Sequence, residues 1–266
     1  MRNIERTTRT VAFDAFKVQF VRGLPRKQII EKIKKEFKIP YGTVYDWYSA
    51  KHLPWGRAGK VILRPEIFYV LGALMGDGCL YRWKPTNNFV ILVGDKRFAT
   101  KYSKYLKLCL GRQQVKPYID RSKNIWFVRT NNFALYELFK KVRVDLVYLE
   151  DLIAKYGKQA GIFFIEGFFD AEGCIKIIKE PSRITPKVCL DMTNTNYELL
   201  CLVHQLLLKN LNVESHFSTQ KPYGNRKECY HLRIYKKDDI RKFLKLLPTT
   251  KLKANKAILV NNWLSR

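Results

Sequence analysis

The sequence lacks hydrophobic runs long enough to cross a membrane, and it lacks the residue spacings that hold zinc. No run of about 18 apolar residues occurs, which excludes a membrane-spanning helix. The first six residues are not a hydrophobic signal region. The six cysteines form no C-x-x-C pair and the four histidines show no ligand spacing, so we expect no zinc site. Cysteines inside apolar runs are typical of a reducing, intracellular compartment, the cytoplasm or a eukaryotic organelle.

Acidic residues are also scarce. The 266 residues include 23 Asp and Glu against 50 Lys and Arg, which gives a net charge of +27. This excess goes far beyond what solubility requires and indicates a polyanionic partner such as nucleic acid. The basic residues are spread along the chain rather than gathered in a tail, which favours an extended nucleic-acid surface.

The first sixty residues show the pattern of a separate helical module. Helical periodicity breaks at Gly23 and Pro25, resumes over 26–37, and resumes again after Thr43, a favourable N-cap residue. Two helices joined by a short glycine-containing turn are typical of a helix-turn-helix DNA-binding domain, although a purely structural extension has the same outline. On the third helix and just after it, the candidates for DNA contact are Tyr45, Asp46, Ser49 and Lys51.

Two later segments repeat one helical pattern, at 70–78 and 165–173. Each has two small residues four positions apart, then an acid and a glycine, and the acids Asp77 and Glu172 are 95 positions apart. Either segment alone reads equally well as an apolar core helix. Matching small faces let two helices pack backbone to backbone, which brings the acids at their ends together. Adjacent carboxylates repel, and a divalent metal ion is the usual reason for placing them together.

These two segments resemble the motif of the LAGLIDADG homing endonucleases, in the single-chain form that carries two copies. The resemblance covers about residues 65–266. The second copy, 169–173, is close to the family pattern, whereas the first copy, 74–78, has Met75 in place of the earlier of two acids. The later acid holds the metal in the family, so the resemblance implies that Asp77 and Glu172 are catalytic metal ligands. Asp170, at the earlier position, we interpret as structural.

The resemblance implies Mg²⁺ as the cofactor, with Mn²⁺ as a substitute. It further implies that the carbonyl oxygens of Gly76 and Ala171 complete the metal shell. The family has a polar residue near the end of each second strand, where Asp95 and Asn194 fall; a helix N-cap is an equally good interpretation of both. The family's lysine near the metal aligns with Lys253. In the first half the corresponding place is Tyr156, beside two lysines.

The strand and helix pattern predicts an α+β fold. In each half, apolar and β-branched runs predict two strand pairs, with a helix near 96–110 or 195–210 between them. We expect a helix-turn-helix-like module and linker at 1–60 and two pseudo-symmetric αββαββα repeats at 61–157 and 158–266. The family resemblance implies that the two repeats form a saddle whose sheets straddle the DNA major groove, in a monomer.

Basic residues on or beside the predicted strands are the candidates for DNA contact. Arginine pairs with guanine through two hydrogen bonds, whereas most lysines contact phosphates. One sequence does not define which face of a strand is inward, so about half of these side chains would point away. The set comprises Arg82, Lys84, Lys123, Arg129, Lys176, Arg183, Lys187, Arg226, Lys227 and Arg233.

The function implied by the resemblance is site-specific double-strand DNA cleavage at a long asymmetric site, as in intron-encoded homing endonucleases. One rival is an RNA splicing maturase that binds the host intron RNA, because the positive charge serves either role equally. A second is a DNA-binding regulator without catalysis. Acids at both matched positions favour cleavage, since neither rival function needs them.

Overall fold

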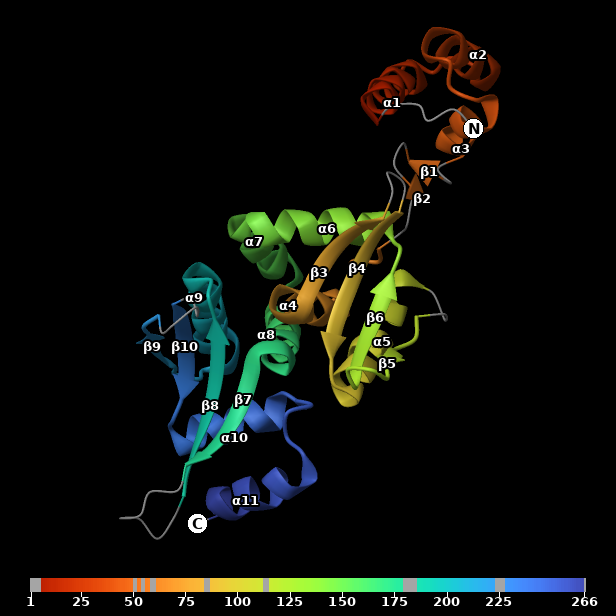
Figure 1. The fold of residues 1–266 in the computed structure, drawn as a ribbon. Helices are drawn as coiled ribbons and strands as arrows, with labels where there is room; N and C mark the ends of the chain where they lie inside the picture. The colour runs from red at the N-terminus through yellow and green to blue at the C-terminus, as the bar shows by residue number, and fades with distance from the viewer. Residues whose placement is uncertain are drawn as a thin grey trace. The chain divides into compact units, whose positions relative to one another are not determined.

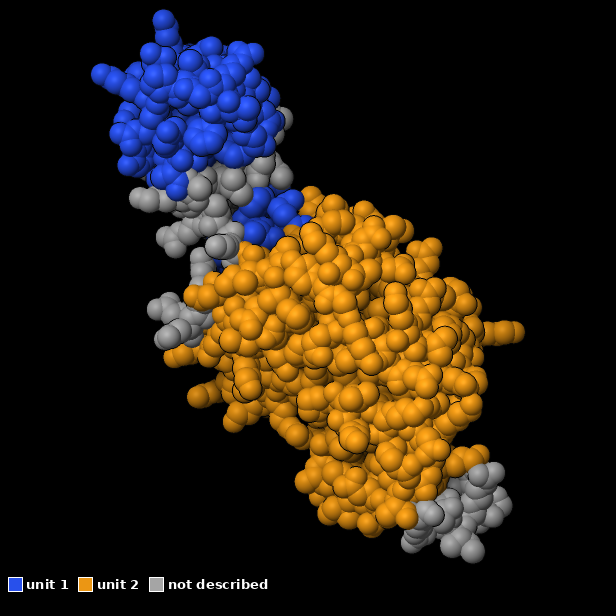
Figure 2. All heavy atoms as spheres, turned by 180° about the vertical axis from the view of Figure 1, so that it is seen from behind, with its two compact units in different colours: residues 1–60, 80–90, 130–137 blue, residues 61–79, 91–129, 138–266 orange. Residues whose placement is uncertain are grey.

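The computed structural model describes residues 6–49, 52–53, 56–57, 61–83, 87–111, 115–178, 186–222 and 228–265. The chain divides into two compact units, shown in Figure 2. One comprises residues 1–60, 80–90 and 130–137, and the other comprises residues 61–79, 91–129 and 138–266. Among the described residues, no helix is long and apolar enough to span a membrane.

Three helices at the N-terminus share a hydrophobic core. They are α1 (Arg6–Val21), α2 (Arg26–Phe37) and α3 (Tyr41–Tyr48), and the fully buried Ile29 and Ile33 lie among the residues that join them. The predicted N-cap at Thr43 is wrong, because α3 already begins at Tyr41, directly after Pro40. Pro40 is the N-cap residue, with φ −57° and ψ 141°, and no side-chain hydrogen bond caps the helix. A short antiparallel pair follows, β1 (His52–Leu53) and β2 (Gly56–Arg57).

The rest of the chain repeats one order of elements, which confirms the predicted α+β fold (Figure 1). The first series is α4 (Glu66–Asp77), β3 (Gly78–Trp83), β4 (Asn87–Gly94), α5 (Lys96–Leu110), β5 (Tyr118–Asp120), β6 (Ile125–Thr130), α6 (Phe133–Val144) and α7 (Leu146–Tyr156). The second is α8 (Lys158–Glu172), β7 (Gly173–Ile178), β8 (Lys187–Asn194), α9 (Tyr197–Leu206) with the π-helical η1 (Leu207–Leu211), β9 (His216–Gln220), β10 (Cys229–Ile234), α10 (Lys237–Leu246) and α11 (Ala254–Ser265).

The two four-stranded sheets have the same strand order, β3-β4-β6-β5 and β7-β8-β10-β9. In the second sheet, Leu190, Met192, Leu232 and Ile234 are buried on the face that α8, α9 and α10 cover. The alternating pleat places the residues between them on the opposite face. That face carries the polar side chains of β7, β8 and β10.

Helices α4 and α8 pack directly against each other (Figure 1). A Cβ atom on Gly72 would lie 2.2 Å from the backbone oxygen of Phe164, and one on Gly167 would lie 2.1 Å from the backbone oxygen of Tyr69. Only a hydrogen side chain allows backbones to approach this closely. The predicted contact between the small faces of the two motif helices is therefore confirmed.

Candidate active site

The two helices end side by side, each at an acid. Helix α4 ends at Asp77 and α8 ends at Glu172, and in both cases the next residue is a glycine that begins a strand. A Cβ atom on Gly76 would lie 2.5 Å from Ala171 Cβ and 2.8 Å from Glu172 Cγ. The structure thus brings together Gly76, Asp77, Ala171 and Glu172, the four residues predicted to hold metal.

The electrostatics of this pair favour a bound cation. Burial raises the pKa of Glu172 to about 7, and the neighbouring Asp77 carboxylate adds to the increase. Loss of solvent also raises the pKa of Asp77, although this side chain is the more exposed of the two. Two carboxylates that disfavour each other's charge are stabilised by a positive ion between them.

Of the two polar residues predicted near the acids, one contacts them. The Asn194 side-chain amide donates a 3.0 Å hydrogen bond to Glu172 Oε1. Asn194 is not the N-cap of α9, because Asn196 has that role. Asp95 is the N-cap of α5 and accepts a 2.9 Å hydrogen bond from the Phe98 N–H. The structure therefore places Asn194 in contact with Glu172, whereas the N-cap interpretation fits Asp95.

The lysine beside the acids is Lys251, two residues before the predicted Lys253. Lys251 Nζ donates a 2.9 Å hydrogen bond to the carbonyl oxygen of Ala171. Its charge lowers the pKa of both Asp77 and Glu172, against the larger effect of desolvation. Lys253 is exposed instead, and its backbone N–H donates to the carbonyl of Lys251.

The sequence interpretation placed Tyr156 at the corresponding position of the first half, and this is wrong. Tyr156 is the last residue of α7 and packs against Phe68 in the first turn of α4, with ring centroids 5.5 Å apart. Lys251 lies between α10 and α11, and the equivalent segment of the first half is the junction of α6 and α7.

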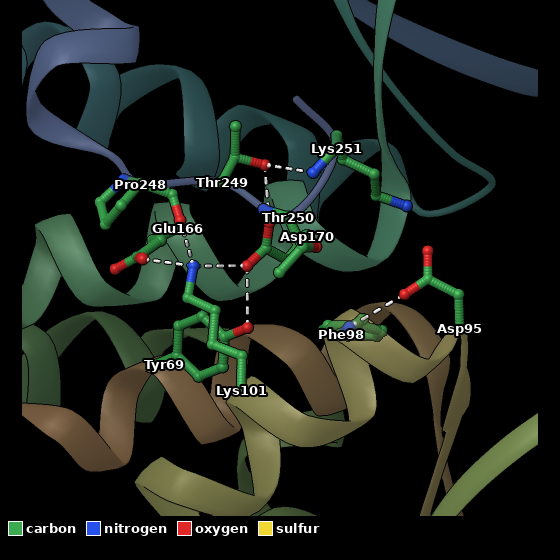
Figure 3. A network of polar contacts seen from close by, with 10 residues as sticks. All are labelled: Tyr69, Asp95, Phe98, Lys101, Glu166, Asp170, Pro248, Thr249, Thr250 and Lys251. Atoms are coloured by element: carbon green, nitrogen blue, oxygen red, sulfur yellow. Dashed lines mark hydrogen bonds and ion pairs between the residues drawn. The ribbon is translucent and has the colours of Figure 1, made fainter. Parts of the chain in front are cut away.

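Behind the site, the buried Asp170 carboxylate accepts four hydrogen bonds (Figure 3). Its donors are Tyr69 Oη at 2.8 Å, Lys101 Nζ at 2.7 Å, Thr249 Oγ1 at 2.6 Å and the Thr250 N–H at 2.7 Å. Donors to the charged form offset the cost of burying a carboxylate. Asp170 is thus tied to α4, to α5 and to the segment after α10.

Lys101 connects this carboxylate to a second buried acid. Its ammonium group lies 2.5 Å from Glu166 Oε1 and donates a 2.6 Å hydrogen bond to the Pro248 carbonyl. Burial raises the pKa of Glu166, and Lys101 opposes the increase. Sequence reasoning missed Lys101, because its partners lie far away along the chain and no local pattern marks it.

The residues at the helix ends fit a hard divalent cation. The donor set is two carboxylates and two carbonyls, which are the oxygen ligands that Mg²⁺ prefers. The Ala171 carbonyl keeps one lone pair for a metal beside its bond from Lys251. Within the described ranges, no three His, Cys, Asp or Glu side chains gather as a metal cluster. Two carboxylates suit Mg²⁺, which keeps several waters.

On the second sheet, two of the predicted DNA-contacting residues share one buried carboxylate. Asp191 forms ion pairs with Lys176 and, at 3.4 Å, with Arg233, and it lies 3.1 Å from His231 Nδ1. Cross-strand pairing places these side chains on the face opposite the helices. The sequence did not define which face of each strand is inward. The structure shows that Lys176 and Arg233 lie on the same face of the second sheet, the one opposite the helices.

The other predicted DNA-contacting residues divide between exposed and less accessible positions. Tyr45 is half-buried, with the Arg26 guanidinium 5.4 Å from its ring centroid. Those that are exposed on strands or turns are Arg82, Lys123, Arg129 and Lys187. Those that lie outside the described residues are Lys51, Lys84, Arg183, Arg226 and Lys227.

Comparison with known proteins finds a family match in the second half of the chain. A family model described as a LAGLIDADG-like domain matches residues 162–248. The uncharacterized protein MJ0398 of Methanocaldococcus jannaschii is 28% identical over 251 residues, which is 85% of each chain. The uncharacterized protein MJ0314 of the same organism is 30% identical over 53% of this chain and 54% of its own length. Elongation factor 2 of Methanopyrus kandleri is 24% identical over 76% of this chain, but over only 15% of its own length.

Solved structures resemble most of the chain. A structure of mesophilic variants of the homing endonuclease I-DmoI, and one of I-DmoI in complex with DNA and calcium, superpose with a TM-score of 0.51 at 22% identity. Each match covers 74% of this chain and 97% of I-DmoI. Residues 162–248 are therefore similar to a LAGLIDADG-like domain, and the chain has the fold of the homing endonuclease I-DmoI.

Proposed function

We propose that this protein is a site-specific double-strand DNA endonuclease of the intron-encoded homing type. It hydrolyses one phosphodiester on each strand, with Mg²⁺ held between Asp77 and Glu172. The observation that carries the proposal is the meeting of these two acids at the ends of α4 and α8. A non-catalytic regulator or an RNA-binding maturase does not need two mutually repelling carboxylates at this position.

The chain's own residues have distinct parts in this reaction. Asp77 and Glu172 would hold the hydrated metal, and Asn194 holds the Glu172 carboxylate through its 3.0 Å hydrogen bond. When bound, the metal would lower the pKa of water and stabilise the charge on the phosphate oxygens. Lys251 adds a positive charge next to the carboxylates, where the negative charge of the reacting phosphate increases.

DNA recognition in this proposal uses the open face of each sheet. The Lys176 and Arg233 side chains lie on that face of the second sheet, and the +27 net charge supplies attraction along the whole duplex. The N-terminal helices add a helix-turn-helix-like contact. The partner is a long, asymmetric duplex site bound by a monomer, because two unlike halves in one chain read unlike half-sites.

Cleavage of a plasmid library tests the proposal. Purified protein is incubated with Mg²⁺ and a library of genomic fragments that contains uninterrupted intron insertion sites, and the ends of linearised plasmids are sequenced. We expect ends at one recurrent long site. The matched control is the double variant Asp77→Asn and Glu172→Gln, which keeps the size and hydrogen-bonding shape of both side chains and should give no linear DNA.

Three results would overturn the proposal. Equal linearisation by the wild type and the double variant would exclude the two acids from the cutting. Specific DNA binding without cutting, in Mg²⁺ and in Mn²⁺, would instead support a regulator. Tight binding of the intron RNA with neither activity on DNA would support the maturase.

A further inference from the structure

We propose that Asp170 and Thr249 are positioning residues that hold Lys251 at the carboxylate pair, with Lys101 as the anchor of the assembly (Figure 3). The part that Lys251 takes in DNA cleavage rests on the proposed function. The positioning of its side chain does not, because it follows from the contacts within the free protein.

The contacts lead from Asp170 to Lys251 without a break. Asp170 Oδ1 accepts from Thr249 Oγ1 at 2.6 Å and from the Thr250 N–H at 2.7 Å. Thr249 Oγ1 in turn accepts a 3.1 Å hydrogen bond from the Lys251 N–H. A hydroxyl group has one proton to donate, so donation to the carboxylate leaves its lone pairs for the lysine backbone. The Lys251 side chain then reaches the Ala171 carbonyl, at 2.9 Å.

Lys101 holds the same segment from its other end. An ammonium group has three protons, and Lys101 has three oxygen neighbours: Glu166 at 2.5 Å, Asp170 at 2.7 Å and the Pro248 carbonyl at 2.6 Å. Asp170 and Glu166 are almost fully buried, so their bonds to one lysine are little screened by solvent. The segment before Lys251 is thus attached at Pro248, Thr249 and Thr250 in succession.

Removal of one hydroxyl group tests this coupling. Thr249→Val keeps the side-chain volume but breaks both bonds of Thr249 Oγ1, whereas Thr249→Ser keeps the hydroxyl. Thr250→Val is the matched control, because the Thr250 hydroxyl is buried and has no hydrogen-bond partner within the described residues. Two quantities are measured: acetylation of Lys251 in the metal-free and DNA-free protein, by mass spectrometry, and the single-turnover cleavage rate together with the DNA dissociation constant.

Thr249→Val removes two hydrogen bonds, so we expect it to increase the rate of Lys251 acetylation severalfold and to slow cleavage about tenfold, with unchanged DNA affinity. Thr249→Ser should behave like the wild type in both measurements, and Thr250→Val should leave Lys251 acetylation unchanged. In a Lys251→Met background, Thr249→Val should slow cleavage no further, because coupled residues are not additive.

Unchanged Lys251 acetylation in Thr249→Val would overturn the positioning proposal, and so would equal effects of Thr249→Val and Thr250→Val on both measurements. Faster acetylation with unchanged cleavage would support the positioning of Lys251 but exclude this lysine from the proposed nuclease chemistry. The two proposals therefore fail in different measurements.

Discussion

Gly72 lies so close to Phe164 that a Cβ atom on the glycine would be 2.2 Å from the backbone oxygen of its neighbour. Backbone cannot yield as a flexible side chain does, so Gly72→Leu should push α4 and α8 apart, at a cost of about 1–3 kcal/mol or more. The separation also spreads Asp77 from Glu172. We expect a lower melting temperature and a still larger loss of Mg²⁺-dependent cleavage. Gly167→Leu should behave in the same way.

Gly42→Ala is the control for this substitution. Gly42 is also in a helix, but a Cβ atom there would meet nothing within 4 Å. Alanine has the better helix propensity, so this variant should be slightly more stable, by up to about 1 kcal/mol. A stable, active Gly72→Leu variant would contradict the backbone contact between the two helices.

Substitution of either acid should separate cleavage from binding. Asp77→Asn or Glu172→Gln should abolish double-strand cleavage while specific DNA affinity stays within about tenfold, roughly 1.4 kcal/mol. The reason is that the acids hold the metal, whereas the sheets hold the duplex. Cleavage assays and electrophoretic binding assays on the same preparations measure both quantities. Substantial double-strand cutting by the double variant would exclude these acids from the mechanism.

The raised pKa of Glu172 predicts a pH effect on the metal-free protein. Its pKa is about 7 in the folded protein against an ordinary value of 4.5, so the folded state binds this proton more tightly than the unfolded state. Its contribution to stability is therefore full below about pH 4.5 and is lost as the pH rises through 7. The melting temperature of the wild type should fall relative to Glu172→Gln over that range. If the melting temperatures of the two proteins changed with pH in the same way, the raised pKa of Glu172 would be contradicted.

Metal binding should follow the opposite trend with pH. A divalent ion needs the ionised carboxylate, so Mg²⁺ affinity and the cleavage rate should both rise as Glu172 deprotonates near pH 7. Isothermal titration with Mg²⁺ or Mn²⁺ at pH 6 and pH 8 measures this. Equal affinity at the two values would separate metal binding from this carboxylate.

Deletion of residues 1–56 tests the N-terminal module. If its helices contact DNA, the shortened protein should remain a folded nuclease with weaker DNA binding. Its affinity should also depend less steeply on salt, because fewer phosphates are neutralised. Binding measured from 50 to 300 mM salt gives both values. Unchanged affinity and slope would assign the module a structural role or another partner.

Asp191→Asn tests the carboxylate that Lys176 and Arg233 share. Removal of its charge frees both cations on the open face of the second sheet, so binding to random-sequence duplex should tighten and its salt dependence should steepen by about one phosphate contact. The matched control is Asp238→Asn, an equal change of charge at an exposed residue of α10, on the helix-covered side. Equal effects of the two variants would show only the change in net charge.

From the sequence alone, the α+β architecture and the pairing of the two acids could be predicted. Helical and strand periodicity are local patterns, so the α+β order of elements could be predicted from residues near one another in the chain. The constant offset of 95 residues paired the glycines of the two motif helices and, with them, Asp77 and Glu172. That inference needed no knowledge of distant contacts, because two helices with matching small residues on one face are expected to pack against each other.

Only the tertiary structure decided the surroundings of the acids. It placed Lys251 rather than Lys253 beside them. It also showed the hydrogen bond from Asn194 to Glu172, and the one from Lys101 to Asp170, 69 residues away in the chain. In an irregular segment a shift of two residues leaves composition unchanged but moves the side chain out of reach. Contacts between residues far apart in the chain depend on how whole elements pack, and no local periodicity records that packing.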